Sequence, residues 1–159
     1  MKPTFLWLCK NPICLLGFGF GTGLSPKAPG TVGTLVAFPL SLLWLLMGFP
    51  VWSLIILGIV LFPIGIFICN HTEKKLGVHD YGGIVFDEIG AMIMILGIVP
   101  FEWLWWLGAF ILFRFFDALK PFPISWFDKR VQGGLGVMLD DYIAGFLCMA
   151  ILYLIDFVI

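Results

Sequence analysis

Long apolar stretches dominate the sequence and alternate with short polar ones. Residues 32–48 and 51–69 are almost free of charge, and each has roughly the length that an α-helix needs to cross a bilayer. Gly48 and Pro50 predict a tight turn between these two stretches. The pattern therefore predicts a membrane-spanning helical hairpin in the first half of the chain.

A second apolar region runs from Ile89 to about Leu119 and is interrupted at residues 100–102. Each arm is short for a full span, so we expect a second hairpin of shorter or tilted helices, shielded within a bundle. The last apolar stretch predicts a helix from near Asp140 to the C-terminus. The expected fold is all-α: a polytopic membrane bundle of about five helices, with residues 1–159 as a single domain.

The polar stretches lie at residues 1–30, 70–88 and 114–141, and together they hold all nine lysine and arginine residues. Two hairpins would bring the chain back to the same side of the membrane each time. The turns at 48–50 and 100–102 carry no positive charge. Because positive charge is retained on the cytoplasmic side of membrane proteins, we expect all three polar stretches to face the cytoplasm.

Composition agrees with an integral membrane protein. Hydrophobic residues make up 61% of the chain and charged residues 12%, with a mean hydropathy of +1.07. The net charge of -1 and the lack of a basic tract give no support for a nucleic-acid partner. The four cysteines form no C-x-x-C pair, which argues against a structural zinc or a redox motif.

A loop rich in glycine and proline, GFGFGTGLSPKAPGTVGT, covers residues 17–34 and leads into the first apolar helix. Its glycines allow backbone amides to turn toward a ligand, which is the usual way to cradle an anion at the start of a helix. The order of residues is not that of a nucleotide-binding P-loop. A flexible entry loop followed by a capped helix is an equally good interpretation.

Two adjacent acidic pairs suggest metal chemistry. Asp87 and Glu88 stand at the start of one predicted helix, and Asp140 and Asp141 at the start of the last one. With Asp117 they offer enough carboxylate oxygens for Mg²⁺, which prefers such ligands together with phosphate oxygens and water. The alternative role for each pair is helix capping and compensation of the helix dipole.

Arg114, Asp117 and Lys120 follow one another at three-residue steps, which on a helix places a cation, a carboxylate and a second cation along one face. Pro121 is expected to end that helix. Lys27, Arg114 and Lys120 would supply positive charge to phosphate oxygens. His71 and His79 are more simply explained as interfacial groups than as catalytic ones.

Several motifs, taken in order, resemble one known family. The segments LSPKAPGT, HDYGGIVFDE, RFFDALKPFPI and GGLGVMLDDYIAG look like those of the phosphatidylglycerophosphatase A family. The resemblance implies a magnesium-dependent membrane phosphatase that converts phosphatidylglycerophosphate to phosphatidylglycerol in the bacterial inner membrane, with its active site facing the cytoplasm.

The resemblance also implies roles for individual residues. The phosphate-binding residues would be Ser25, Lys27, Thr31, Arg114 and Lys120. The metal ligands would come from Asp87, Glu88, Asp117, Asp140 and Asp141, and the catalytic residues would be Asp87, Glu88, Asp117 and Asp141.

Two other functions are alternatives to a phosphatase. A CDP-alcohol phosphotransferase also uses paired acids at the membrane surface, but its D-G-x-x-A-R pattern is absent from the sequence. A small transporter or assembly subunit that uses interfacial ion pairs is the non-enzymatic alternative. Its charges would be expected near the middle of the bilayer, whereas nearly all charges here lie at the ends of apolar segments.

Overall fold

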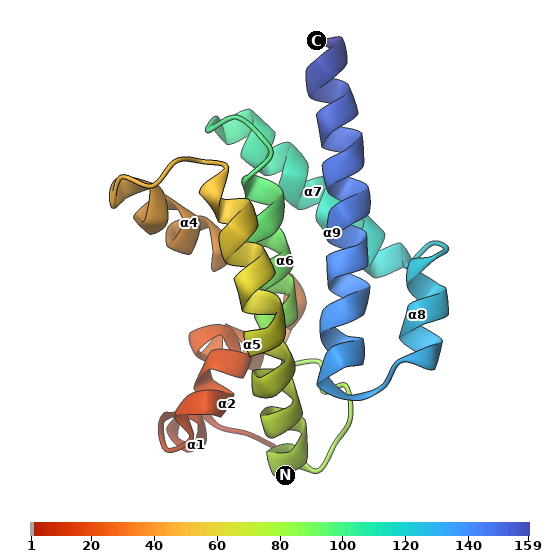
Figure 1. The fold of residues 1–159 in the computed structure, drawn as a ribbon. Helices are drawn as coiled ribbons and strands as arrows, with labels where there is room; N and C mark the ends of the chain where they lie inside the picture. The colour runs from red at the N-terminus through yellow and green to blue at the C-terminus, as the bar shows by residue number, and fades with distance from the viewer. Residues whose placement is uncertain (1) are drawn as a thin grey trace.

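The computed structural model describes residues 2–159, and helices joined by loops and turns make up that part of the chain, with no β-strand (Figure 1). This confirms the all-α bundle predicted from the sequence. The elements are α1 (Phe5–Cys9), α2 (Pro12–Gly17), the 3₁₀-helix η1 (Gly19–Leu24), α3 (Pro29–Thr34), α4 (Ala37–Leu46), α5 (Ser53–Leu76), α6 (Phe86–Leu96), α7 (Trp103–Leu119), α8 (Ile124–Arg130) and α9 (Gly133–Val158).

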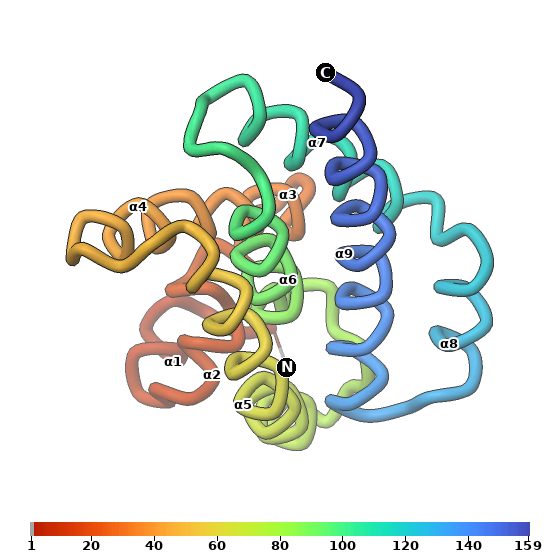
Figure 2. Tube along the Cα trace, turned by 45° about the horizontal axis from the view of Figure 1, so that its top comes forward, coloured from red at the N-terminus to blue at the C-terminus, as the bar shows by residue number. Residues whose placement is uncertain are grey.

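Helix α6 forms the centre of the molecule and packs against α5 and α9 (Figures 1 and 2). Every residue from Ile89 to Leu96 is buried. A helix that is apolar on all sides is stable only where other helices surround it. The expectation that the arms of the second hairpin are shielded within the bundle is therefore confirmed for α6.

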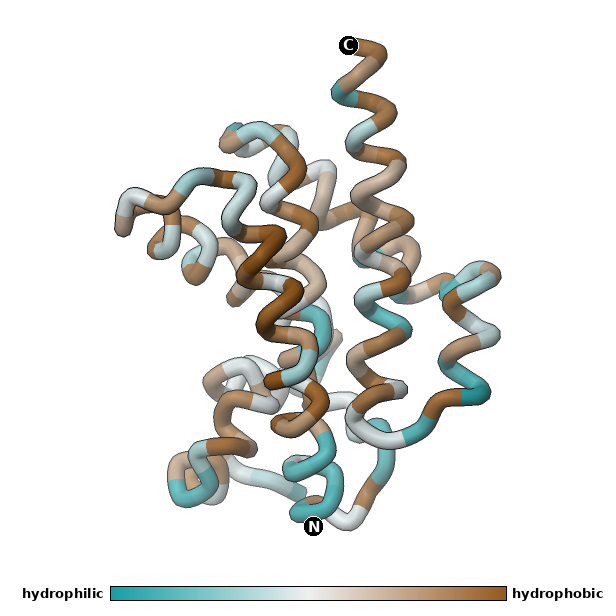
Figure 3. Tube along the Cα trace, in the orientation of Figure 1, coloured by the Kyte–Doolittle hydropathy of each residue, from teal (hydrophilic) through white to brown (hydrophobic). Residues whose placement is uncertain are grey.

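Three segments are long and apolar enough to cross a membrane: Pro29–Leu46, Ser53–Leu76 and Gly133–Val158. By comparison, α6 has 11 residues and α7 has 17, so both are shorter than a typical span, as predicted. Figure 3 shows that the hydrophilic segments gather toward the end of the molecule that holds α1, α2 and the start of α9. The chain thus has the construction of a helical membrane protein.

Helix α5 is longer than the apolar pattern indicated. It was expected to end at residue 69, but it continues to Leu76 and stops at Gly77, whose φ of 71° gives a left-handed cap. Lys74 and Lys75 lie in its last turn, where positive charge interacts favourably with the helix dipole. The first part of the polar stretch 70–88 is therefore helical rather than a loop.

Helix α9 begins at Gly133, so the prediction of a start near Asp140 was wrong. Gly134 and Gly136 lie in the first turns of this helix, where neighbouring backbone comes so close that there is no room for a side chain. A Cβ on Gly134 would lie 2.4 Å from the Ile66 carbonyl oxygen, and one on Gly136 would lie 2.2 Å from that of Val131. Asp140 and Asp141 are consequently about 10 Å inside the helix rather than at its first turn.

The three polar stretches meet at one end of the bundle. The Thr34 hydroxyl donates to Oε2 of Glu88 at 3.2 Å, and Arg114 pairs with Oε1 of Glu88 at 3.1 Å. The amide of Gly134 donates to Oδ1 of Asn70 at 2.6 Å, which also satisfies a free N–H at the start of α9. The first contact joins the end of α3, just after the stretch 1–30, to the stretch 70–88, and the other two join 70–88 to 114–141.

Candidate active site

Three carboxylates from three different helices come together in the bundle. Glu88 of α6, Asp117 of α7 and Asp141 of α9 each offer one oxygen atom, and these oxygens all lie within 4.8 Å of one another. Helices α6, α7 and α9 lie close together here and so bring the three carboxylates to one place. No single helix could provide this arrangement. The three residues are defined here as the acidic cluster.

Arg114 lies at the edge of the acidic cluster and bridges two of its members. Its Nη1 atom pairs with Glu88 and donates a hydrogen bond to Asp117 on the next turn of α7. The predicted pairing of Arg114 with Asp117 along one helix face is therefore confirmed. Because a guanidinium presents several N–H groups in a fixed plane, it can hold two carboxylates and still offer donors to a ligand.

Helix α3 also contacts the acidic cluster, at Glu88. Besides receiving the bond from Thr34, Glu88 lies so close to Gly30 that a Cβ there would be 2.4 Å from Oε1. Neither Gly30 nor Thr34 was among the predicted site residues. Their four-residue spacing, which places both on one side of a helix, is the sequence signal that could have indicated them.

Asp87 adds a fourth acid beside the acidic cluster. It neighbours Asp141, and the exposed fractions of Asp87 and Asp141 are only 8% and 4%. Oδ1 of Asp87 is buried and has no hydrogen-bond partner within residues 2–159. Burying charged carboxylates without partners is costly, so the site favours a cation among them. An all-oxygen donor set of this kind fits a hard divalent metal.

Lys120 belongs to a second group of charges. Its φ of 44° places it outside the regular turn of α7, and its Nζ atom lies 2.9 Å from Oδ2 of Asp140 and 3.0 Å from Oδ1 of Asp128. Pro121 follows the end of α7, as predicted. The expectation that Lys120 shares a helix face with Arg114 was wrong, because the chain turns left-handed one residue before the proline.

The environment of Lys120 favours its charged form. Partial burial works against the ammonium, but the hydrogen bond and charge of Asp140, followed by those of Asp128, raise its pKa above the ordinary value. Asp140 is thus neutralised by Lys120, while its neighbour Asp141 belongs to the acidic cluster. The two members of this acidic pair face different surroundings.

The remaining predicted residues lie around this centre. The Ser25 hydroxyl donates to the Lys27 carbonyl at 2.8 Å in the loop before α3, and the Lys27 side chain is exposed. Thr31 lies in α3, one residue after Gly30. The segment from Ser25 to Thr34 therefore reaches the acidic cluster through Gly30 and Thr34 of α3. The role of Ser25, Lys27 and Thr31 in phosphate binding stays a prediction.

Both histidines make their contacts outside the acidic cluster. Nδ1 of His79 lies 2.9 Å from Oε1 of Glu73, and the His71 ring packs at 6.2 Å from that of Phe67. A small polar hollow lined by His79, Asp80, Asp128 and Asp140, among others, lies beside Lys120. These positions agree with interfacial roles for both histidines.

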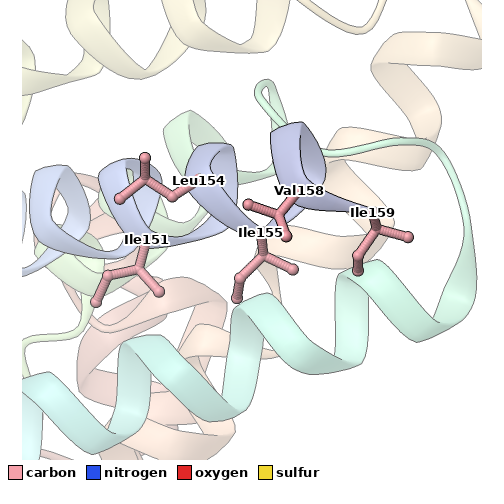
Figure 4. A pocket seen from close by; sticks show the side chains of 5 residues that line it. All are labelled: Ile151, Leu154, Ile155, Val158 and Ile159. Atoms are coloured by element: carbon pink, nitrogen blue, oxygen red, sulfur yellow. The ribbon is translucent and has the colours of Figure 1, made fainter.

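A large apolar hollow occurs elsewhere, near the C-terminal end of α9. Ile151, Leu154, Ile155, Val158 and Ile159 line it (Figure 4), and none of them carries a polar group. Along α9 it begins about 17 Å beyond Asp140. This hollow is therefore apolar and lies apart from the acidic cluster.

The sequence that carries these acids and cations is similar to that of known proteins. The sequence model of the phosphatidylglycerophosphatase A family matches residues 15–156. The chain belongs to this family. The match covers the α3 loop, both acidic pairs and the segment from Arg114 to Pro121, so every residue of the acidic cluster lies inside it. The resemblance noted from the motifs is thereby confirmed.

Individual members of the phosphatidylglycerophosphatase A family are similar over most of the chain. One from Escherichia coli with that name is 47% identical over 148 residues, covering 92% of this chain and 84% of the relative. Another from Haemophilus influenzae, with the same name, is 42% identical and covers 92% of this chain and 90% of the relative.

A third relative, from Bacteroides thetaiotaomicron, carries the provisional name phosphatidylinositol-3-phosphatase. It is 37% identical and covers 91% of this chain and 89% of the relative. No solved structure matches the chain.

Proposed function

We propose that this membrane protein is a phosphatidylglycerophosphatase: it removes the terminal phosphate of phosphatidylglycerophosphate to give phosphatidylglycerol. The observation that carries the proposal is the acidic cluster with Arg114 at its edge, in a chain of the phosphatidylglycerophosphatase A family. The same arrangement argues against a transporter or assembly subunit, because the charges converge on one site instead of lying along a path through the membrane.

Glu88, Asp117 and Asp141 would hold Mg²⁺, with Asp87 beside them and Asp140 paired to Lys120. When bound there, Mg²⁺ would supply positive charge to the phosphate and help to orient the attacking oxygen. The fit is supported by the surplus of acids: Arg114 pairs with Glu88 and Asp117, while Asp87 and Asp141 have no ion-pair partner within residues 2–159. A phosphomonoester dianion would enter this site only if further positive charge were present.

Arg114 and Lys120 would bind phosphate oxygens from two sides. Asp87 keeps a free carboxylate oxygen next to Asp141, so it can accept the proton of an attacking water. In the reaction, a new bond forms between phosphorus and the water oxygen, and the bond from phosphorus to the glycerol oxygen breaks. The glycerol oxygen then takes up a proton to leave as a hydroxyl group.

The site would face the cytoplasm of a bacterial inner membrane. All nine lysine and arginine residues belong to the three stretches that meet near the acidic cluster, and the positive-inside rule assigns that end to the cytoplasm. The diacylglycerol tails can then remain in the bilayer while the headgroup reaches the acids. A substrate that never leaves the membrane explains why the enzyme is embedded in it.

Phosphate release by the detergent-purified protein tests the proposal. Phosphatidylglycerophosphate is presented in mixed micelles with Mg²⁺ or with a chelator, and an Asp141→Asn sample purified in the same way controls for contaminating phosphatases. We expect release only from the native protein with Mg²⁺. Phosphatidylinositol 3-phosphate is tested in parallel because of the name of the third relative. No release from phosphatidylglycerophosphate would refute the proposal, and release without metal would refute its Mg²⁺ part.

A further inference from the structure

The hydroxyl of Tyr142 lies in a narrow space between α5, α6 and α9, and this space is called the seat. Tyr142 extends from α9, and its hydroxyl donates a hydrogen bond of 2.7 Å to the Gly58 carbonyl of α5. The Phe62 ring of α5 packs edge-on against the Tyr142 ring, with 4.8 Å between centroids. The side chain is buried. Tyr142 therefore fixes α9 against α5 by one polar and one aromatic contact.

Gly90 of α6 forms the other wall of this seat. A Cβ at Gly90 would lie 2.5 Å from the Tyr142 hydroxyl oxygen, closer than real Cβ atoms come, whereas the next ring atom, Cζ, would be at an ordinary 3.4 Å. Gly58 also lacks room, since its Cβ would lie 2.4 Å from that of Met94 on α6. Two glycines thus let α5 and α6 approach each other and leave space for one oxygen atom from α9.

The seat lies immediately beside the acids. Tyr142 directly follows Asp141 on α9, and Gly90 is two residues after Glu88 on α6. Carboxylates held as close as those of the acidic cluster repel each other when no cation lies between them. The contacts of Tyr142 with Gly58 and Gly90 thus involve α6 and α9, the same helices that carry Glu88 and Asp141.

We infer that Tyr142 is a positioning residue: its hydroxyl, seated against Gly90 and bonded to Gly58, sets the distance between Glu88 and Asp141 and thereby the affinity for a divalent metal. This inference rests on the metal site of the proposed function. Tyr142 acts through the helices and touches neither metal nor substrate.

A double-mutant cycle tests the inference with Mn²⁺ as the probe, measured by electron paramagnetic resonance on the detergent-purified full chain. Gly90→Ala should lower Mn²⁺ affinity roughly 10-fold, the scale of residues that orient metal ligands. Tyr142→Phe removes the oxygen that an alanine Cβ would strike. The double variant should therefore bind Mn²⁺ more tightly than Gly90→Ala alone. Gly108→Ala is the matched control, because a Cβ there meets nothing within 4 Å.

The outcomes separate this inference from the metal site itself. Failure of the native protein to bind Mn²⁺ would overturn both. The inference alone is wrong if the native protein binds Mn²⁺ and Gly90→Ala weakens that binding by the same factor in the native background and in the Tyr142→Phe background. In that case the seat has no role in metal binding. Should Gly90→Ala not fold, recovery of folding and Mn²⁺ binding in the double variant supports the inference, and failure of the double variant as well contradicts it.

Discussion

Glu88 of α6 and Arg114 of α7 form an ion pair in which Nη1 of Arg114 lies 3.1 Å from Oε1 of Glu88. The same nitrogen atom bonds Asp117, so one guanidinium restrains two of the three members of the acidic cluster. Because both carboxylates are partly buried, the pairing matters more here than at an exposed surface. Arg114 thus has a structural role before any substrate binds.

Arg114→Lys should lower turnover at least about tenfold although the charge is kept. A lysine ammonium is a single point charge on a flexible stem, so it is not expected to stay within reach of both Glu88 and Asp117. Turnover of phosphatidylglycerophosphate at saturating Mg²⁺ is the measurement, with Lys75→Ala, at an exposed position, as the control. Turnover equal to that of the native protein would mean that charge alone is needed at this position.

Asp87→Asn, Asp117→Asn and Asp141→Asn should each abolish activity and weaken Mg²⁺ binding while the protein stays folded. The change keeps the shape of the side chain and removes its charge. In the native protein, Mg²⁺ at about 100 times its Kd should stabilise the fold by about 2.7 kcal/mol, and the variants should lose this gain. Thermal unfolding with and without Mg²⁺ measures the difference.

Without Mg²⁺, Asp141→Asn should be at least as stable as the native protein, because it removes a buried charge that lies close to other acids. A loss of stability in Asp141→Asn without Mg²⁺ would instead indicate that this acid has only a structural role. If these acids have only a structural role, each substitution costs about 1 kcal/mol of stability and Mg²⁺-dependent turnover is largely kept. That outcome at two of the three positions would contradict the metal site.

Lys120→Ala should reduce turnover roughly 100-fold without unfolding the protein, because the ammonium both neutralises Asp140 and supplies charge to phosphate. Lys129→Ala on the neighbouring α8 is the matched control, since that side chain is exposed. Kinetics on the purified variants measure the effect. Activity of Lys120→Ala close to that of the control would exclude Lys120 from the site.

The stability contributed by Lys120 should change only at high pH. Its folded-state pKa is raised, so this contribution is fully present below the ordinary lysine pKa of about 10.4 and is lost as pH rises through the folded-state value. Above about pH 10.4, the stability difference between the native protein and Lys120→Ala should shrink as pH rises. A difference that stays constant at those pH values, measured by thermal unfolding, would contradict the assignment.

Cysteine labelling in intact cells tests which end of the bundle faces the cytoplasm. Starting from a Cys9→Ser chain, which lacks the exposed cysteine, single cysteines at Lys75 and Lys129 should resist a membrane-impermeant reagent. A cysteine at the exposed Phe49 should react. Reaction at Lys75 or Lys129 from outside would reverse the orientation that the positive charges indicate.

Much of the architecture followed from the sequence because its cause is local. Apolar runs of sufficient length become helices in a bilayer, since every backbone polar group must be satisfied within the segment. The hairpin turn at residues 48–50, the end of α7 before Pro121 and the position of Asp87 and Glu88 in the first turn of α6 were all predicted correctly. Each depends on residues that are neighbours along the chain.

The tertiary structure decided what depends on close approach. Gly134 and Gly136 suggested a turn, yet they are helical, and they are glycines because the backbone of Ile66 and Val131 leaves no room for side chains there. The sequence presented Asp140 and Asp141 as one pair, but successive helix residues point about 100° apart. Asp140 therefore meets Lys120, and Asp141 joins Glu88 and Asp117. The sequence alone determined which carboxylates exist near one membrane face, and only the packing of α6, α7 and α9 determined which of them share a site.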